Sequence, residues 1–298
     1  MTKLGLVTVL FNANEVLEDF VKSISIQSFK NYVLYFIDNT PSEETDQLIA
    51  QLNGRYPLSA YKHIKNPQNY GVAKANNQGI EIALQAGADY VLLLNNDIAI
   101  SQPFLLQQMV NKATESREDI IVPKILYYGT RKIWLAGGNF LHYKGTSQTI
   151  GDKEIDCGQY DNAGYTDYAP TCFMLCSKKV FADTGLMDER YFVYYDDNDF
   201  IFRAKNKGFK IFYMPSIEVF HKVSFSTGGA ESLFSIYYLN RNRIYFIRKH
   251  FTFPLKHIAL MHMMITKGIR YLFYSAERKH QLLKAVKNGF EMRFSSSN

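Results

Sequence analysis

Short apolar runs alternate with amphipathic stretches along the first third of the chain. The apolar runs are typical of buried strands and read LGLVTVLF at 4–11, YVLYFID at 32–38, a short run at about 59–64 and DYVLLLN at 89–95. The stretches between them have helical spacing and lie at about 15–25, 42–52 and 72–85. This order predicts an α/β fold with a mostly parallel sheet and helices on both faces.

The middle of the chain has a different pattern. It is richer in Gly, Tyr and short apolar runs, and the segments 129–140 and 144–152 have the composition of loops over a mixed sheet. A helix is predicted to begin near Asp196 and to end before Gly208, and a strand, FKIFYMP, follows at 209–215.

The C-terminal region is helical and basic. Beyond about Ala230 apolar residues recur at three- and four-residue spacing, and Pro254 divides them into at least two helices. From Arg241 onward there are twelve Lys or Arg residues and two acids, against a net charge of +6 for the whole chain. Such helices suit a membrane surface with anionic lipid, although they could instead pack on the α/β unit or form a homodimer. No nucleic-acid-binding motif accompanies the charge.

The cysteines and the N-terminus indicate the compartment. Three cysteines, Cys157, Cys172 and Cys176, cannot all pair with one another and do not match a metal-binding pattern, which favours the reducing cytoplasm. The N-terminal MTKLGLVTVLF is interpreted as a first strand and not as a signal peptide. Because no uncharged apolar run reaches the roughly 18 residues of a spanning helix, we expect a soluble or peripheral protein.

Polar side chains follow three of the predicted strands. They are Asn12 after the first, Asp38 and Asn39 after the second, and Asn95, Asn96 and Asp97 after the fourth. Each could form a turn or cap a helix. However, ligands of open α/β sheets bind beyond the carboxyl ends of the strands, so their meeting at one edge favours a binding site.

The segment NPQNYGVAKANNQGI at 66–80 offers a further set of polar groups. Gly71 permits close backbone approach, and Asn76 and Asn77 present amides early in the predicted helix. A closely packed helix would explain the same residues. The signature G-x-G-x-x-G is absent after the first strand, as is a P-loop lysine, which argues against hydride transfer and against a P-loop ATPase.

Acidic residues crowd the start of the predicted helix near 196. Asp196, Asp197 and Asp199 lie where the helix dipole favours negative charge, and Asp199 is spaced to form a structural ion pair with Arg203. One acid would suffice as a cap, so three in four positions favour a functional cluster.

Taken in order, these motifs resemble family 2 glycosyltransferases with the GT-A fold, in particular their rhamnosyltransferase-like branch. The motifs are VTVLFN, Asp38-Asn39, NYGVAKANNQGI, LLLNND, GLMDERYFVYYDDND, Arg203 and His221. The resemblance covers about residues 4–250. It implies a Rossmann-like nucleotide-diphospho-sugar transferase with a catalytic domain at 1–230, made of a nucleotide-sugar half (about 1–125) and an acceptor half (about 126–230), and a helical C-terminal region at 231–298.

The resemblance also implies a metal site that contains Mg²⁺ or Mn²⁺. The NND sequence stands in place of the family's Asp-x-Asp motif, which leaves Asp97 as the acidic ligand and His221 as the residue that completes the metal shell. Such a cation neutralises the charge of the leaving diphosphate. Asn95 occupies the position of the first acid, so we expect modest metal affinity.

Further roles follow from the resemblance. Asp38 would contact the edge of the nucleotide base. The donor site would also include Asn12, Asn69, Gly71, Asn76, Asn77, Asn95, Asn96 and Arg203. Asp197 would be the general base of an inverting transfer, although Asp196, in place of a glutamate, leaves the choice between the two acids open. Trp134 and Gly138 would form an acceptor wall, unless Trp134 is an ordinary core residue.

The preferred donor by similarity is dTDP-rhamnose, and the preferred acceptor is a lipid-linked saccharide or polysaccharide of the bacterial surface, such as lipopolysaccharide or capsule, at the cytoplasmic face of the plasma membrane. A UDP-dependent galactosyl- or glucosyltransferase is the alternative. A sugar nucleotidyltransferase would need a Gly-rich basic loop after the first strand, which LFNANEVLEDF lacks. A non-catalytic sugar-nucleotide or glycan-binding protein would differ from these enzymes by the absence of turnover.

Overall fold

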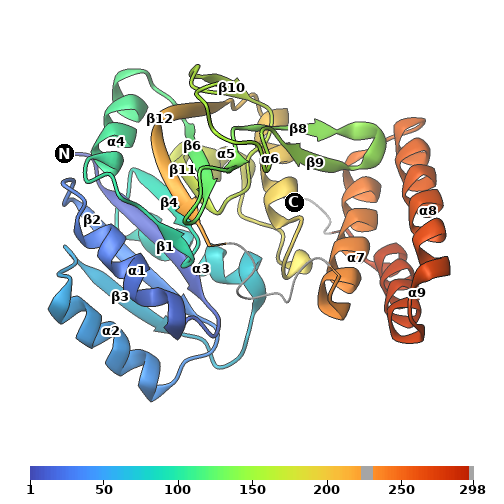
Figure 1. The fold of residues 1–298 in the computed structure, drawn as a ribbon, viewed down its shortest axis with the longest axis horizontal. Coiled ribbons are helices and arrows are strands. Elements are labelled where there is room, and N and C mark those ends of the chain that lie inside the picture. Colours follow the sequence, from blue (N-terminus) through green and yellow to red (C-terminus); the bar gives the residue numbers. More distant parts are fainter. Residues whose placement is uncertain (223–230, 295–298) are drawn as a thin grey trace.

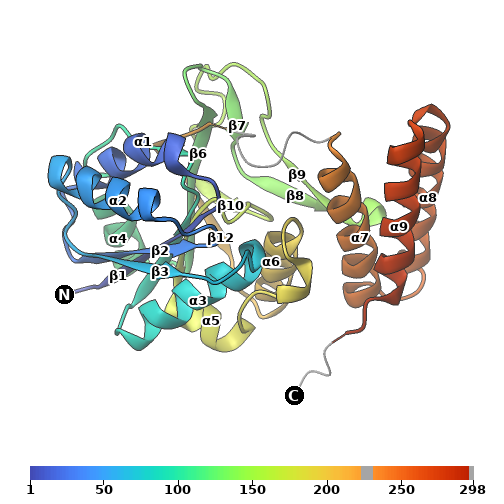
Figure 2. The same ribbon diagram turned by 90° about the horizontal axis from the view of Figure 1, so that it is seen from below.

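The computed structural model describes residues 1–222 and 231–294. Its N-terminal third alternates strands and helices as the sequence predicts. The strands are β1 (Leu4–Leu10), β2 (Tyr32–Asp38), β3 (Tyr61–Lys65), β4 (Tyr90–Leu94) and β5 (Ile98–Ala99), and the helices are α1 (Asn14–Ser25), α2 (Glu43–Arg55), α3 (Gly71–Gln85) and α4 (Leu105–Glu115). In Figure 2, α1 and α2 lie on one face of the sheet and α3 on the other.

The second part of the chain completes the same sheet. Its strands are β6 (Ile120–Tyr127), β7 (Ile133–Leu135), β8 (Gly138–Leu141), β9 (Thr146–Thr149), β10 (Gly164–Thr166), β11 (Phe173–Ser177) and β12 (Ile211–His221). Its helices are the short η1 (His142–Lys144) and η2 (Glu189–Tyr191), with α5 (Lys178–Thr184) and α6 (Asp196–Asn206). The expectation of loops at 129–140 and 144–152 is wrong in part, because β7 pairs with β6 and β8 pairs with β9.

The strand order is β10-β12-β6-β11-β4-β1-β2-β3. Strands β3, β2, β1 and β4 are parallel, as are β6 and β12, whereas β11 runs antiparallel to β4 and β6. The sheet is therefore mixed and mostly parallel, as predicted. The carboxyl ends of β1, β2 and β4 meet at one edge, where the polar residues that follow them gather.

Helix α3 packs closely on β1 because two glycines face the contact. A Cβ atom on Gly79 would collide with Val7, and one on Gly5 would collide with Ala83. Ala73 and Ala75 are fully buried on the same helix. This close packing brings the N-terminus of α3 to the edge of the sheet where the strands end.

The C-terminal region forms α7 (Leu233–His250), α8 (Leu255–Phe273) and α9 (Ala276–Glu291), with the break at Pro254 as predicted. Figure 1 shows these helices together at the opposite end of the molecule from β3, with the β8–β9 hairpin extending toward them. Within the described residues, none of the helices combines the length and apolar character needed to cross a bilayer.

Candidate active site

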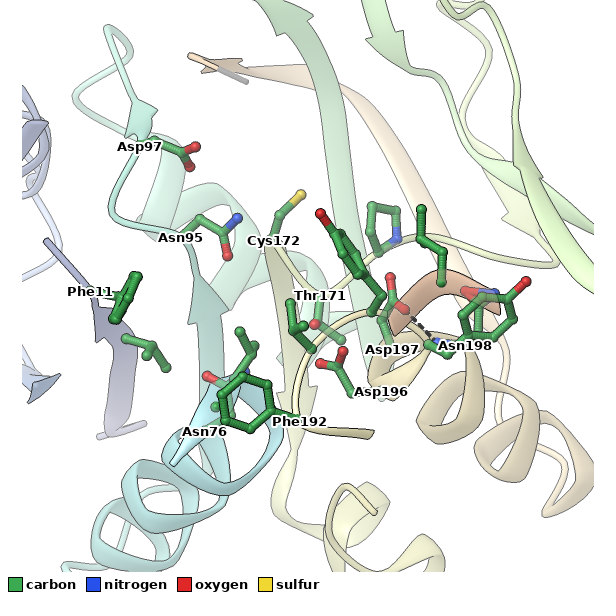
Figure 3. A pocket seen from close by; sticks show the side chains of 18 of the residues that line it. Phe11, Asn76, Asn95, Asp97, Thr171, Cys172, Phe192, Asp196, Asp197 and Asn198 are labelled. Carbon is green, nitrogen blue, oxygen red and sulfur yellow. Dashed lines mark hydrogen bonds between the residues drawn. The ribbon is translucent and has the colours of Figure 1, made fainter. Parts of the chain in front are cut away.

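A cavity of about 760 Å³ opens beyond the carboxyl ends of β1 and β4. It brings together eleven of the residues singled out from the sequence, namely Asn39, Asn69, Gly71, Asn76, Asn95, Asn96, Asp97, Trp134, Asp196, Asp197 and His221. Figure 3 shows Asp97 on one side of this cavity and Asp196 and Asp197 across it.

Asp97 and His221 lie together because β5 pairs with the end of β12. His221 Nε2 lies 3.1 Å from Asp97 Oδ1, but the two atoms lack hydrogen-bond geometry. Asp97 Oδ1 and His221 Nδ1 are both buried without a hydrogen-bond partner among the described residues. Trp134 packs edge-on against the imidazole, with ring centroids 4.6 Å apart, and so restricts its orientation.

This pair fits a divalent cation. Two neighbouring ligands of an octahedral ion at about 2.1 Å would be separated by roughly 3.0 Å, which is close to the spacing of Asp97 Oδ1 and His221 Nε2. A buried carboxylate oxygen without a partner is costly, and a cation would satisfy it. No group of three His, Cys, Asp or Glu side chains within 1–222 and 231–294 is arranged to hold a metal, so further ligands would come from water or from the phosphates of a donor.

Asp196 and Asp197 open helix α6 across the cavity. Tyr168 donates its hydroxyl to Asp197 Oδ2 at 2.7 Å, and the Asn198 amide donates to Asp197 Oδ1 at 2.7 Å. Burial raises the pKa of Asp197, and these two bonds oppose the rise. Burial and the neighbouring Asp197 raise the pKa of Asp196 to about 8. The hydrogen bonds from Tyr168 and Asn198 therefore favour a negative charge on Asp197 over one on Asp196.

The raised pKa of Asp196 predicts a pH-dependent effect of Asp196→Asn on stability. Between about pH 4 and 8 the unfolded carboxyl ionises while the folded carboxyl keeps its proton, so this residue lowers stability as pH rises. The amide cannot ionise. We expect the free energy of unfolding of Asp196→Asn relative to wild type to increase from pH 5 to pH 8, by roughly 3 kcal/mol, in urea titrations. If the difference in unfolding free energy between the variant and wild type does not change with pH, the pKa of Asp196 is not raised.

The start of α3 forms the floor of the cavity. Asn69 Oδ1 accepts from the Gly71 amide at 2.9 Å, and Asn39 Nδ2 donates to the Gly71 carbonyl at 3.2 Å. The Val72 amide donates to the Phe192 carbonyl at 2.5 Å. Gly71 has φ +80°, and a Cβ there would collide with the Phe192 carbonyl and ring. This glycine therefore allows α3 to meet the segment that precedes Asp196.

Gly71→Ala is expected to separate these two segments. The left-handed backbone and the collision with Phe192 both oppose the methyl group, so a loss of about 1–3 kcal/mol in unfolding free energy is expected. Gly54→Ala is the matched control, because a Cβ on that helical glycine meets nothing within 4 Å, and we expect it to be neutral or stabilising. Equal effects of the two substitutions in thermal unfolding would contradict this account.

Five residues expected in the site do not line the cavity. They are Asn12, Asp38, Asn77, Gly138 and Arg203. Asp38 is 1% exposed; its carboxylate accepts from the Thr40 amide at 2.9 Å and lies 3.0 Å from His63 Nε2. Asn77 exchanges hydrogen bonds with the Met187 backbone.

Arg203, which the resemblance placed in the donor site, makes structural contacts and does not line the cavity. Its guanidinium donates to Asp199 Oδ2 at 2.7 Å and to the carbonyls of Thr184 and Leu186, so it is the structural ion pair that its spacing also predicted. Asn12 is exposed, with a positive φ, and its amide donates to Thr40. Gly138 lies in the β8–β9 hairpin, where its amide donates to Thr166.

Several cavity residues were not identified from the sequence. They include Tyr168, Thr171, Cys172, Phe192, Tyr194 and Tyr195. The aromatic run before Asp196 was a partial signal, but it did not indicate which rings face a ligand. Burial, and then the nearby Asp97, raise the pKa of Cys172, which disfavours the thiolate form. All three cysteines are free.

Comparison with known proteins supports a common fold and family. Residues 6–181, more than half of the chain, match the family model described as Glycosyl transferase family 2. The chain is 24% identical over 242 residues to the low-salt glycan biosynthesis hexosyltransferase Agl10 of Haloferax volcanii, covering 80% of this chain and 74% of the relative. It is 25% identical over 236 residues to the dTDP-rhamnosyl transferase RfbF of Shigella flexneri, covering 75% of this chain and 72% of the relative.

Solved structures share the fold. S. aureus TarS 1-349 in complex with UDP-GlcNAc has a TM-score of 0.63 at 14% identity, over 97% of this chain and 81% of that one. This chain spans about half, 49%, of the longer TarS chain. The mannosyltransferase PcManGT from Pyrobaculum calidifontis, solved with GDP-Man and Mn²⁺, has a TM-score of 0.59 at 11% identity, over 97% and 86%. The fold is GT-A, and the chain belongs to glycosyl transferase family 2, whose members act on nucleotide sugars.

Proposed function

We propose that this protein is a metal-dependent, inverting glycosyltransferase in which Asp197 is the general base. The observation that supports this most directly is that Asp97 with His221, and Asp196 with Asp197, face one cavity from opposite sides. A donor diphosphate held beside Asp97 leaves the Asp197 side for the acceptor.

The residues on the two sides of the cavity have different roles in the proposed reaction. Asp97 and His221 would hold Mg²⁺ or Mn²⁺, which neutralises the negative charge on the diphosphate. Asp197, oriented by Tyr168 and Asn198, accepts the proton of the acceptor hydroxyl. The hydroxyl oxygen bonds to the anomeric carbon as the bond from that carbon to the diphosphate breaks. Asp196 keeps its proton, so it does not add a second negative charge to the site.

The proposed donor is dTDP-rhamnose. The similarity to RfbF, named as a dTDP-rhamnosyl transferase, supports this choice. A UDP-hexose is the alternative, since Agl10 is named only as a hexosyltransferase and TarS is solved with UDP-GlcNAc. Incubation with a panel of dTDP-, UDP- and GDP-sugars, with release of the nucleoside diphosphate as the readout, tests the proposal. Absence of release from every donor, with acceptor extracts present, would favour a non-catalytic binding protein.

The proposed acceptor is a lipid-linked saccharide or polysaccharide of a bacterial surface glycan, reached at the cytoplasmic face of the plasma membrane. Helix α8 supports this, because it exposes large apolar side chains. They are Ile258, Met261, Met264, Ile265, Ile269, Leu272 and Phe273, preceded by Phe253. Lys and Arg outnumber acids from Arg241 onward, so this face combines apolar area with attraction to anionic lipid.

Co-sedimentation with vesicles tests the membrane surface. We expect binding to phosphatidylglycerol-containing vesicles, and about tenfold weaker binding for Ile265→Ser with Ile269→Ser. Ile26→Ser, another exposed isoleucine, is the matched control away from α8. If the wild-type protein does not bind vesicles but forms a dimer through α8 in light scattering, the apolar face of α8 contacts a second copy of the chain and not a membrane.

A further inference from the structure

The segment from Tyr191 to Tyr195 has an unusual backbone. Phe192, Tyr194 and Tyr195 have φ of 66°, 61° and 67°, which is the left-handed region. None of them is glycine, and bulky residues in this region are strained by roughly 1–3 kcal/mol each. Such a conformation persists only where surrounding groups hold it.

Asn242 of helix α7 stabilises this backbone conformation. Its side chain is fully buried, and Nδ2 donates to the carbonyls of Tyr191, Val193 and Tyr194 at 2.9, 2.7 and 2.8 Å. Arg241 Nε donates to Asn242 Oδ1 at 2.8 Å, which fixes the orientation of the amide.

Arg241 strengthens the same contact. Its Nη2 donates to the carbonyls of Arg190 and Tyr191 at 2.8 and 2.9 Å. Arg243 on the same helix donates to the Lys144 carbonyl. Both guanidinium groups therefore bind protein backbone.

The segment 191–195 contacts both α3 and α7. The Phe192 carbonyl accepts from Val72 at the start of α3, and the Phe192 ring stacks on Tyr238 of α7 at 5.2 Å. Phe192, Tyr194 and Tyr195 line the cavity, and Asp196 and Asp197 follow directly. A change in the backbone here would move both carboxylates.

We propose that Asn242 is a positioning residue: together with Arg241, it holds 191–195 in the conformation that directs Asp196 and Asp197 into the cavity. The catalytic part of this inference rests on the proposed function. It makes α7 part of the catalytic apparatus, because one buried amide of this helix binds three carbonyls of the segment that leads into α6.

Asn242→Ala is expected to lower kcat by on the order of 10²-fold, since small displacements of a catalytic group have effects of this size. The affinity for the nucleoside diphosphate should change less than about threefold, because Asp97 lies on the other side of the cavity. The pH dependence of kcat should shift as well, because a relaxed segment admits water to Asp196 and Asp197. Asn242→Asp, which keeps the size but removes the donors, should lose at least as much.

Asn240→Ala is the matched control. Asn240 is also buried on α7, but its Nδ2 donates to Ile236 within the same helix at 2.6 Å. We expect this variant to lose stability while keeping kcat within about threefold of wild type and keeping its pH profile. If Asn240→Ala and Asn242→Ala lower kcat equally, or if Asn242→Ala keeps wild-type kcat and pH profile, the positioning role is wrong.

Amide hydrogen exchange tests whether Asn242 stabilises the segment 191–195, and it does not require enzyme activity. The backbone amides of Phe192 and Val193 donate to the nearby carbonyls of Glu189 and Tyr191. Asn242→Ala should accelerate their exchange by about tenfold or more over Asn240→Ala under native conditions. Equal exchange in the two variants would overturn the inference even if no donor is found. If no donor is turned over but Asn242→Ala exchanges faster, the proposed function fails and the structural hold stands.

Discussion

Asp197→Asn is expected to reduce kcat by about 10³-fold, within the usual range for removal of a general base. The amide keeps the size of the side chain and cannot accept the proton of the acceptor. Tyr168 and the backbone amide of Asn198 donate to different oxygens of Asp197. In the variant the Asn198 amide can keep the remaining carbonyl oxygen, and the Tyr168 hydroxyl can accept from the new NH2 group. Binding of the nucleoside diphosphate, measured by calorimetry, should therefore remain within about threefold of wild type.

Asp196→Asn is the matched substitution for this test. Burial and its neighbour raise the pKa of Asp196, so the wild-type side chain is already neutral at pH 7 and the amide resembles it. We expect this variant to retain activity within about tenfold. The reverse result, an inactive Asp196→Asn beside an active Asp197→Asn, would transfer the role of base to Asp196.

Removal of divalent cations is expected to have the second large effect. Rigorous chelation should lower transfer by at least about 10²-fold, and Mn²⁺ or Mg²⁺ should restore it, because the diphosphate then leaves without a counter-charge. Asp97→Ala should weaken Mn²⁺ binding measured by electron paramagnetic resonance, in the presence of nucleoside diphosphate, by tenfold or more. Unchanged transfer after chelation would remove the metal from the proposal.

Two substitutions refine the metal test. Cys172→Ala alters a neighbouring cavity side chain without removing an oxygen or nitrogen, and should leave Mn²⁺ affinity unchanged. Asn95→Asp adds the carboxylate that the resemblance expects at the first motif position, and should tighten Mn²⁺ binding. If Asn95→Asp weakens binding, Asn95 faces away from the cation.

The local pattern of apolar and polar residues was sufficient to predict the main strands of the sheet and its main helices. The runs at 32–38 and 89–95 became β2 and β4 with nearly the same limits, because strands buried on both faces leave a continuous apolar signal. The hairpin at β8 and β9 was missed. It has a mixture of Gly, polar and apolar residues, and its strands are stabilised mainly by pairing with each other.

The position of Asp97 at the cavity could also be anticipated, because side chains that follow parallel strands share an edge. Asp196 and Asp197 begin helix α6, and the resemblance indicated their place in the site. The position of Asp38 could not be anticipated. Whether a carboxylate at a strand end faces a ligand or is buried depends on partners such as His63, which comes from a different strand. Arg203 was assigned to the donor by resemblance, whereas its own spacing from Asp199 indicated the ion pair that the structure contains.

The sequence by itself determined the order of strands and helices, the family, and the acidic residues available for chemistry, since these depend on local spacing and on the identity of side chains. Only the tertiary structure decided which of those residues face the cavity and how the segment before Asp196 is held. The left-handed backbone at Phe192, Tyr194 and Tyr195 is unfavourable for each residue alone. It exists because Asn242, nearly fifty residues later in the chain, donates to the carbonyls between them.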